Sequence, residues 1–296
     1  MQAALLPDRG VVKVSGDDAR RFLNGLVTSD MDAVGPGSSR FAALLTPQGK
    51  IICDFIVIEA AADDGGGFFL DCPRALAPML VEKLAFYKLR AKVAVQDLSA
   101  ALGVMAFWNG EGQSDDGLSY ADPRLPALGT RTIIPPDLAA EAAATLGAEL
   151  AGPEAYDAHR IALGVPKGGE DFAYLDTFPH EADMDQLGGV DFDKGCYVGQ
   201  EVVSRVEHRS TARKRLVPIA YGEFSPLQGL TVTAGDREIG ALCTTAKGHG
   251  LAMLRLDRVA EAMTSGTPLI AGGIELQVVK PAWAKFPWPG EPVTPA

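Results

Sequence analysis

The chain has 296 residues and is 47% hydrophobic, which suits two or three compact domains with ordinary buried cores. Its 27 basic and 38 acidic residues give a net charge of -11, which argues against general nucleic-acid binding because that function needs a positive surface. No apolar run approaches the ~20 residues of a membrane span, and the N-terminus lacks a basic stretch followed by an apolar core. We therefore expect a cytoplasmic protein without membrane contacts.

The cysteines and histidines are scattered along the chain. Cys53, Cys72, Cys196 and Cys243 form no C-x-x-C pair, and no two histidines have the spacing of a metal site. Zinc sites and most iron–sulfur sites start from closely spaced thiols. The sequence therefore predicts no metal or cluster held by this chain alone, and no disulfide framework.

The N-terminal part has the alternation of strands and helices typical of an α+β layer. A strand is expected at residues 11–15, followed by a helix with apolar residues at helical spacing. Apolar runs at 41–45 and 51–58 flank Thr46-Pro47-Gln48-Gly49, which suits a type I turn, so we expect a hairpin. Further strands are expected at 68–71, 91–96 and 103–107, with a helix at about 74–88.

The pattern changes along the rest of the chain. Residues 110–123 are predicted to form a loop, and 181–187 a short helix at most. Helices are expected at 137–150, 154–163 and 200–208. Short alternating strands with glycine-containing turns then predict an antiparallel barrel or sandwich, with strands at 216–221, 230–233, 239–245, 251–256 and 274–279. We place a domain boundary near residue 210.

Residues 191–201, DFDKGCYVGQE, carry the most chemical information. Cys196 lies in a turn before a predicted helix, whose N-terminus together with nearby Lys194 would favour thiolate over thiol. Gly195 and Gly199 would let the backbone bend around the cysteine. The alternative is a small buried thiol in a tight loop, and local physics leaves both open.

Residues 194–201 resemble the K-G-C-[FY]-x-G-Q-E signature of the YgfZ family of folate-binding proteins. Segments similar to the glycine-cleavage T-protein lie at 46–57, 178–187, 212–221, 238–240 and 242–245. The resemblance covers most of the chain and implies a three-lobed, aminomethyltransferase-like α+β fold that binds folate and ends in an antiparallel β-barrel. It implies that residues 1–210 form two interleaved α+β lobes, the folate-binding region, and that residues 211–296 form the barrel domain.

Asp54 shares a strand face with Ile52, Ile56 and Ile58. A carboxylate on such an apolar face needs a partner or a proton, and buried carboxylates gather at functional sites. The alternative is a strand end where Asp54 meets solvent or caps a turn. The resemblance implies that Asp54 lies beside the reactive folate nitrogens, so Asp54 and Cys196 are the candidate catalytic residues.

Glu181 is the second candidate carboxylate. A pterin presents an exocyclic amine and a ring N–H side by side, which one carboxylate can accept in a bidentate pair. The resemblance implies this role for Glu181, whereas the alternative is an acid at a helix N-terminus. Lys194 and Tyr197, from the signature, are the further candidate folate contacts.

A basic run lies between residues 205 and 215, with five Lys or Arg residues against one acid. Such a run suits the carboxylates of a folate tail, and its alternatives are a solvated surface or a patch for an RNA or protein partner. The resemblance places Lys214 or Arg215 near that tail. Arg215 is therefore included among the candidate cofactor-binding residues.

These observations lead to one expected function and two alternatives. We expect a tetrahydrofolate-binding protein that acts in iron–sulfur cluster assembly or repair, with iron–sulfur client or assembly proteins as partners. Cys196 favours this function, because T-proteins lack a cysteine in this segment. Asp54 and Glu181 together favour a folate-dependent aminomethyl or one-carbon transferase. The third possibility is a module that senses folate without chemistry, so enzymatic activity stays open.

Overall fold

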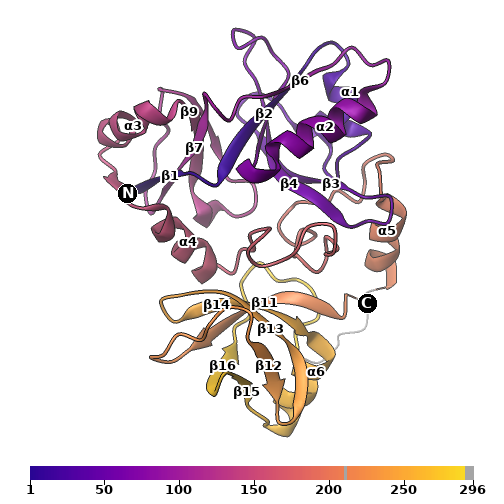
Figure 1. The fold of residues 1–296 in the computed structure, drawn as a ribbon, viewed down its shortest axis with the longest axis vertical. Coiled ribbons are helices and arrows are strands. Elements are labelled where there is room, and N and C mark those ends of the chain that lie inside the picture. The colour runs from indigo at the N-terminus through magenta and orange to yellow at the C-terminus, as the bar shows by residue number, and fades with distance from the viewer. Residues whose placement is uncertain (210–211, 291–296) are drawn as a thin grey trace. The chain divides into compact units, whose positions relative to one another are not determined.

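The computed structural model describes residues 1–209 and 212–290, and the chain divides into two compact units that alternate along the sequence. The first unit contains Met1–Tyr156 and Leu187–Glu201. The second contains Asp157–Gln186 and Val202–Ala296. Figure 1 labels most of the helices and strands of both units, numbered in chain order.

The first unit is built on two five-stranded sheets, with strand orders β10-β1-β7-β9-β8 and β3-β4-β5-β2-β6. The strands of the former are β1 (Gln2–Leu6), β7 (Gly103–Trp108), β8 (Leu118–Ala121), β9 (Thr130–Ile134) and β10 (Glu149–Leu150). Those of the latter are β2 (Arg9–Ser15), β3 (Ser39–Leu45), β4 (Ile51–Glu59), β5 (Phe68–Pro73) and β6 (Ala94–Asp97). The helices are α1 (Ala19–Asn24), α2 (Ala77–Lys88), α3 (Ala139–Thr145) and the start of α4 (Pro153–Ala162).

The predicted hairpin of β3 and β4 is confirmed, and it forms one side of the second sheet. The turn closes through a hydrogen bond from Gly49 N–H to the Thr46 carbonyl at 2.8 Å. Every residue of β4 except the last is buried, as expected of a strand covered on both faces. Leu23 of α1 and Leu80 of α2 belong to the same buried cluster as Phe55.

The two sheets of the first unit are joined by a buried ion network around Asp71 of β5. Its carboxylate accepts from Arg9 Nε at 2.6 Å, from Arg131 Nη1 at 2.7 Å and from the Tyr120 hydroxyl at 2.9 Å. Arg131, on β9, also donates to Asp122 at 2.9 Å. Burial opposes ionisation of Asp71, but the two guanidinium groups prevail and hold its pKa below the usual value.

The second unit contains the closed antiparallel barrel that the sequence predicts, in the order β11-β14-β13-β12-β15-β16. Its strands are β11 (Lys214–Tyr221), β12 (Thr231–Ala234), β13 (Arg237–Ala246), β14 (His249–Arg255), β15 (Leu269–Ala271) and β16 (Ile274–Val278). Apolar side chains such as Val217, Ile219 and Leu254 fill the barrel. The unit also contains the later part of α4, most of α5 (Gln200–Arg209), and α6 (Leu256–Ser265).

Several predicted boundaries are wrong, and each has a local reason. The expected loop at 110–123 contains β8, a four-residue edge strand that directly follows a polar, glycine-containing stretch. The expected helix at 137–150 shortens to α3, and its last residues form β10. Three short strands, β1, β9 and β15, were not predicted because each is a run of at most five residues. Helix α6 was not predicted either, and a predicted strand ended at the residue where it begins. Residues 181–187 form turns, which agrees with the expectation of a short helix at most.

Within the described residues, we find no helix that is both long enough and apolar enough to span a membrane.

We expect Arg131→Met to lower the free energy of unfolding of the first unit by about 3–5 kcal/mol, because it removes a cation shared by two buried carboxylates. The matched control is Lys92→Met in the same unit, whose ion pair with Asp17 is 77% and 81% exposed and should cost less than about 1 kcal/mol. Hydrogen exchange of the β5 and β9 amides in urea measures the effect on this unit. Equal losses in both variants would show that the network contributes no more than a surface pair.

Candidate functional site

The signature segment, residues 191–201, belongs to the first unit and is irregular up to the start of α5. Lys194 anchors it, because its ammonium group donates to the carbonyls of Asn24, Val27 and Ser29 at 2.8, 2.7 and 2.8 Å. These carbonyls lie at the end of α1 and just beyond it, where a helix leaves carbonyl groups without intrahelical partners. Lys194 therefore ties the signature segment to the connection between α1 and β3.

Tyr197 packs beside Lys194. Its side chain is buried, and the Lys194 ammonium nitrogen lies 5.2 Å from the centre of the ring, within the range of a cation–π interaction. Burial lowers the pKa of Lys194 to about 8, and burial raises the pKa of Tyr197 to about 12. The two candidate residues thus form one buried contact, in which the tyrosine stays a neutral phenol.

The two glycines of the signature have different roles. Gly199 has a φ of +83°, and a Cβ atom there would lie 2.5 Å from the Thr46 carbonyl oxygen. It lets the signature segment approach the β3–β4 turn more closely than any side chain would allow. A Cβ atom added at Gly195 would have no neighbour within 4 Å. The expectation that both glycines shape the backbone around Cys196 therefore has steric support only at Gly199.

Cys196 is exposed, whereas Cys53, Cys72 and Cys243 are buried. Burial raises the pKa of Cys53 well above its ordinary value and the pKa of Cys72 and of Cys243 to about 12. The exposed position of Cys196 removes the alternative of a buried packing thiol. All four cysteines lie in the described part of the chain, and Cys196 is the one whose sulfur a partner or reagent can reach.

Asp54 lies within β4, opposite Ala43 in the β3–β4 ladder, and is 7% exposed. The predicted burial of this carboxylate is therefore confirmed. Asp54 acts electrostatically on Arg9. Burial lowers the pKa of Arg9, whereas the carboxylate of Asp71 and, less strongly, that of Asp54 raise it, so that the pKa of Arg9 is raised overall. Asp54 is thus a buried carboxylate in a strand that is otherwise apolar.

Glu181 belongs to the second unit and is half-buried. Its Oε2 atom accepts from the backbone N–H of Phe178 at 2.9 Å, and its own carbonyl accepts from Leu216 N–H at 2.9 Å. The side-chain bond fixes the orientation of the carboxylate and uses one of its roughly four acceptor positions. The remaining positions suit the paired donors of a pterin.

Arg215 is buried and uses its guanidinium group inside the second unit. It donates to Asp183 at 3.0 Å, to both oxygens of Asp185 at 2.8 Å and to the His180 carbonyl at 2.7 Å. It also lies 4.4 Å from the centre of the Phe286 ring. These contacts make Arg215 the organiser of the segment that carries Glu181.

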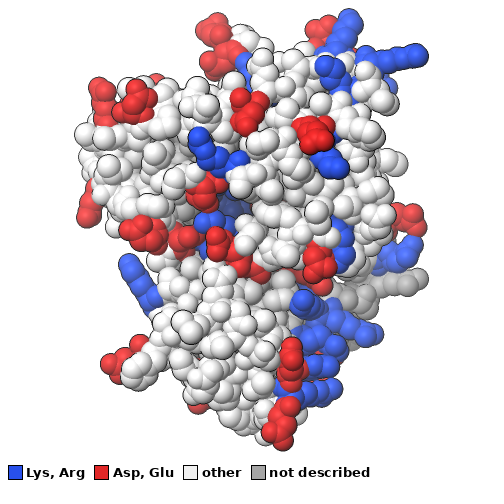
Figure 2. Space-filling model, in the orientation of Figure 1, with Lys and Arg blue, Asp and Glu red and all other residues white. Residues whose placement is uncertain are grey.

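The rest of the predicted basic run is more open. Arg205, Arg213 and Lys214 are exposed. The side chain of Arg209 and the predicted domain boundary at residue 210 lie outside the described residues. Figure 2 shows Lys and Arg side chains gathered at the lower right, over the part of the second unit that carries α6. Three members of the predicted basic run are therefore exposed on this unit, and their role stays a prediction.

The structure places the candidate residues in two groups. Asp54, Lys194, Cys196 and Tyr197 belong to the first unit, whereas Glu181 and Arg215 belong to the second. Sequence reasoning missed the contact of His180 with Glu207, whose side chains meet at 3.0 Å. No local sequence pattern predicts this pair, because 27 positions separate the two residues.

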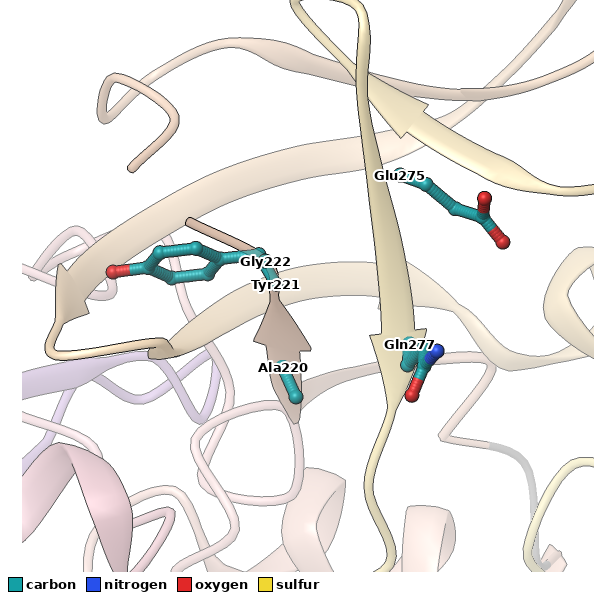
Figure 3. Close-up of a pocket in the computed structure, with 5 residues that line it drawn as sticks. All are labelled: Ala220, Tyr221, Gly222, Glu275 and Gln277. Atoms are coloured by element: carbon teal, nitrogen blue, oxygen red, sulfur yellow. The ribbon is translucent and has the colours of Figure 1, made fainter. Parts of the chain in front are cut away.

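A separate depression of about 270 Å³ lies on the outside of the barrel. It is lined by Ala220, Tyr221, Gly222, Glu275 and Gln277. Figure 3 shows Glu275 and Gln277 projecting from one strand, while the Tyr221 ring points away from them. None of the candidate site residues lines this depression, so it is not the expected folate site.

Comparison with known proteins defines the class. Residues 8–108 match the GCVT N-terminal domain, and residues 213–286 match the C-terminal beta-barrel domain of CAF17. The solved structure of the glycine cleavage system aminomethyltransferase T from Bartonella henselae covers 97% of this chain and 87% of its own, with a TM-score of 0.77 and 17% identity. The chain therefore has the GcvT-like aminomethyltransferase fold with a C-terminal barrel, as the sequence predicts.

Three curated relatives are named "Iron-sulfur cluster assembly factor IBA57", with the word homolog in the two fungal names. The Mycosarcoma maydis protein is 36% identical, over 74% of this chain and 57% of its own length. The Pyricularia oryzae protein is 30% identical over 90% of this chain and 75% of its own length. The human protein is 28% identical over 86% of this chain and 77% of its own length. This chain belongs to the IBA57 family. It spans little more than half of the Mycosarcoma maydis relative.

The expectation of a cytoplasmic location is wrong by this comparison, because these relatives are all named as mitochondrial proteins. The expectation rested on the lack of a basic stretch followed by an apolar core. That pattern identifies secretory signals, whereas mitochondrial targeting segments are amphipathic and rich in arginine and serine. The sequence test therefore addressed a different kind of signal.

We expect iodoacetamide to label the native protein at Cys196 and nowhere else. The other three thiols are buried and have raised pKa values, so both access and thiolate formation oppose their reaction. Peptide mapping by mass spectrometry identifies the labelled site, and unfolding in urea should expose all four. Labelling of Cys53 or Cys243 at a rate similar to that of Cys196 in the native state would contradict the assignment.

Proposed function

We propose that this chain acts as an iron–sulfur cluster assembly factor that presents Cys196 to a cluster or to a thiol on a partner protein. The single observation that carries the proposal is one exposed thiol on a segment anchored by Lys194, Tyr197 and Gly199. The relatives' names support the process, and the resemblance to the YgfZ signature supports the role of the segment.

The coordination chemistry of clusters determines what one cysteine can do. Iron–sulfur clusters are commonly held by four cysteine thiolates. Cys53, Cys72 and Cys243 are buried and do not offer further ligands at the surface. Cys196 would therefore contribute a single ligand to a cluster whose other ligands come from a client or assembly protein, and the cluster would be cargo rather than a resident group.

We propose further that the chain binds tetrahydrofolate or a one-carbon derivative. Each unit offers one carboxylate of the kind this group needs. On the second unit, Glu181 has an oriented carboxylate with acceptor positions left for a pterin, and on the first unit Asp54 is a buried carboxylate. Lys194 and Tyr197 would hold the signature segment in place while folate is bound. Folate would supply a reduced pterin or its one-carbon unit.

The contacts of Arg215 refine its proposed part in folate binding. Its guanidinium group is engaged by Asp183, Asp185 and the His180 carbonyl, so we assign it to holding the backbone around Glu181. The neighbouring Lys214 is exposed and is better suited to meet a carboxylate of the folate tail. Arg215 then acts on folate through Glu181 rather than directly.

A folate-dependent aminomethyltransferase is the second candidate. It is favoured by the presence of both Asp54 and Glu181 in a GcvT-like fold, although a fold shared at 17% identity carries no activity with it. An assay of aminomethyl transfer to tetrahydrofolate separates the two candidates. Transfer that is lost in Asp54→Asn and kept in Cys196→Ala would favour the transferase.

We expect Glu181→Gln to weaken tetrahydrofolate binding by about 1–3 kcal/mol, the cost of losing a charged hydrogen bond in a buried site. The amide oxygen of glutamine can still accept from Phe178 N–H, so the local turn should survive. Titration calorimetry measures the affinity, with the exposed Glu223→Gln as the matched control. An affinity equal to that of the control would remove Glu181 from the folate site.

We expect Cys196→Ala to abolish support of iron–sulfur enzymes in cells that depend on this chain, with folding and folate affinity unchanged. The reason is that it removes one exposed sulfur and no packing contact of the core. Gly195→Ala is the control, because nothing lies within 4 Å of the added methyl group. Full iron–sulfur enzyme activity with Cys196→Ala would show that the signature is needed for the turn that it forms and not for its thiol.

A further inference from the structure

Three side chains of the second unit bring potential metal ligands together. One nitrogen of His180 and one carboxylate oxygen each of Asp185 and Glu207 lie within 4.8 Å of one another. His180 and Asp185 come from the irregular segment before the signature, and Glu207 comes from α5. The three residues thus converge from distant parts of the sequence, which is the usual construction of a metal site.

Two of the three ligands are held in place by Arg215. Its guanidinium group makes a bidentate pair with Asp185 and also donates to the backbone carbonyl of His180. Metal-ligating carboxylates are typically hydrogen-bonded by an outer shell of this kind, which fixes their orientation. A carboxylate oxygen has two lone pairs, so the pairing with Arg215 leaves Asp185 able to coordinate a cation.

The charges around these ligands favour a further cation. Asp185 and Glu207 bring two carboxylates to the cluster, and the guanidinium group of Arg215 pairs with Asp185. Asp183 is fully buried, and its Oδ2 atom has no hydrogen-bond partner within the described residues. Asp183 lies beside Asp185, because each accepts a hydrogen bond from the Arg215 Nη1 atom, at 3.0 and 2.8 Å respectively. A buried carboxylate oxygen without a partner is costly unless positive charge lies near it.

We propose that His180, Asp185 and Glu207 bind one divalent first-row transition-metal ion. One imidazole nitrogen with two carboxylate oxygens suits zinc, cobalt, manganese or ferrous iron better than magnesium or calcium, which prefer oxygen ligands alone. Three protein ligands leave at least one position of a tetrahedral ion to water.

The burial of the ligands indicates how the ion would enter. The side chains of His180 and Asp185 are 3% exposed, whereas that of Glu207 is 45% exposed. Glu207 therefore forms the outer wall, and without metal its carboxylate is hydrogen-bonded to His180 Nε2 at 3.0 Å. Binding would replace this bond by two metal–ligand bonds, and any proton shared between the two side chains would be released to solvent.

The test is zinc binding by the full-length, metal-stripped chain, measured by titration calorimetry. It is done in a Cys196→Ser background, because the exposed thiol would bind zinc independently. We expect one ion per chain, and at least about tenfold weaker binding after Glu207→Gln or His180→Leu. The matched controls are Glu223→Gln and His249→Leu, which change exposed residues of the same unit and should bind as the parent does.

Cobalt gives a second readout that does not depend on affinity alone. Its visible absorption should show nitrogen and oxygen ligation without a thiolate band in the Cys196→Ser background, and this spectrum should disappear with Glu207→Gln. Glu207 is partly exposed, so this variant decides the outcome even if His180→Leu fails to fold. Absence of binding, or binding equally tight in Glu207→Gln and its control, would overturn the site and leave His180 and Glu207 as an ion pair.

Discussion

The carboxylate of Asp71, fully buried between two sheets, is the interaction on which the first unit depends. An ionised carboxylate without partners would cost several kcal/mol at such a position. Here two guanidinium groups and a phenol compensate it. Because these donors come from β2, β8 and β9, the charge is compensated only when both sheets have reached their native register. The network therefore selects one arrangement of the sheets, and with it the position of β4 and Asp54.

The same principle recurs wherever the chain lacks regular structure. Between the end of α4 and the start of α5 the chain makes few regular hydrogen bonds, and its carbonyl groups need other donors. In the second unit, buried cations supply them: Arg160 donates to the Val165 carbonyl and Arg215 to the His180 carbonyl. In the first unit, Lys194 of this segment donates instead to carbonyls at the end of α1 and just beyond it. Both segments that carry candidate site residues are thus ordered by side-chain charge rather than by secondary structure, which suits loops that carry function.

The features that could be predicted from the sequence are those with a local signal. The hairpin around Thr46–Gly49, the barrel and the burial of Asp54 follow from alternation, turn residues and the apolar strand. The exposure of Cys196 could not be decided, because a loop thiol can face either way and long-range packing settles the choice. Tyr197 and Gly199 are explained only by their contacts with Lys194 and Thr46. The cluster of His180, Asp185 and Glu207 depends on how α5 packs against residues 180–185, and a local stretch of sequence does not determine that packing.

The alternation of the two units has a consequence for how the protein is made. The first unit needs residues 187–201, but the ribosome synthesises 157–186, which belong to the other unit, in between. Until the later segment emerges, the hydroxyl of Thr28 lacks its acceptor at Gly189, and the carbonyls of Asn24, Val27 and Ser29 lack the ammonium group of Lys194. Completion of the first unit during translation therefore coincides with delivery of the segment that carries Cys196, so this thiol and the ammonium group that anchors its segment join the first unit together.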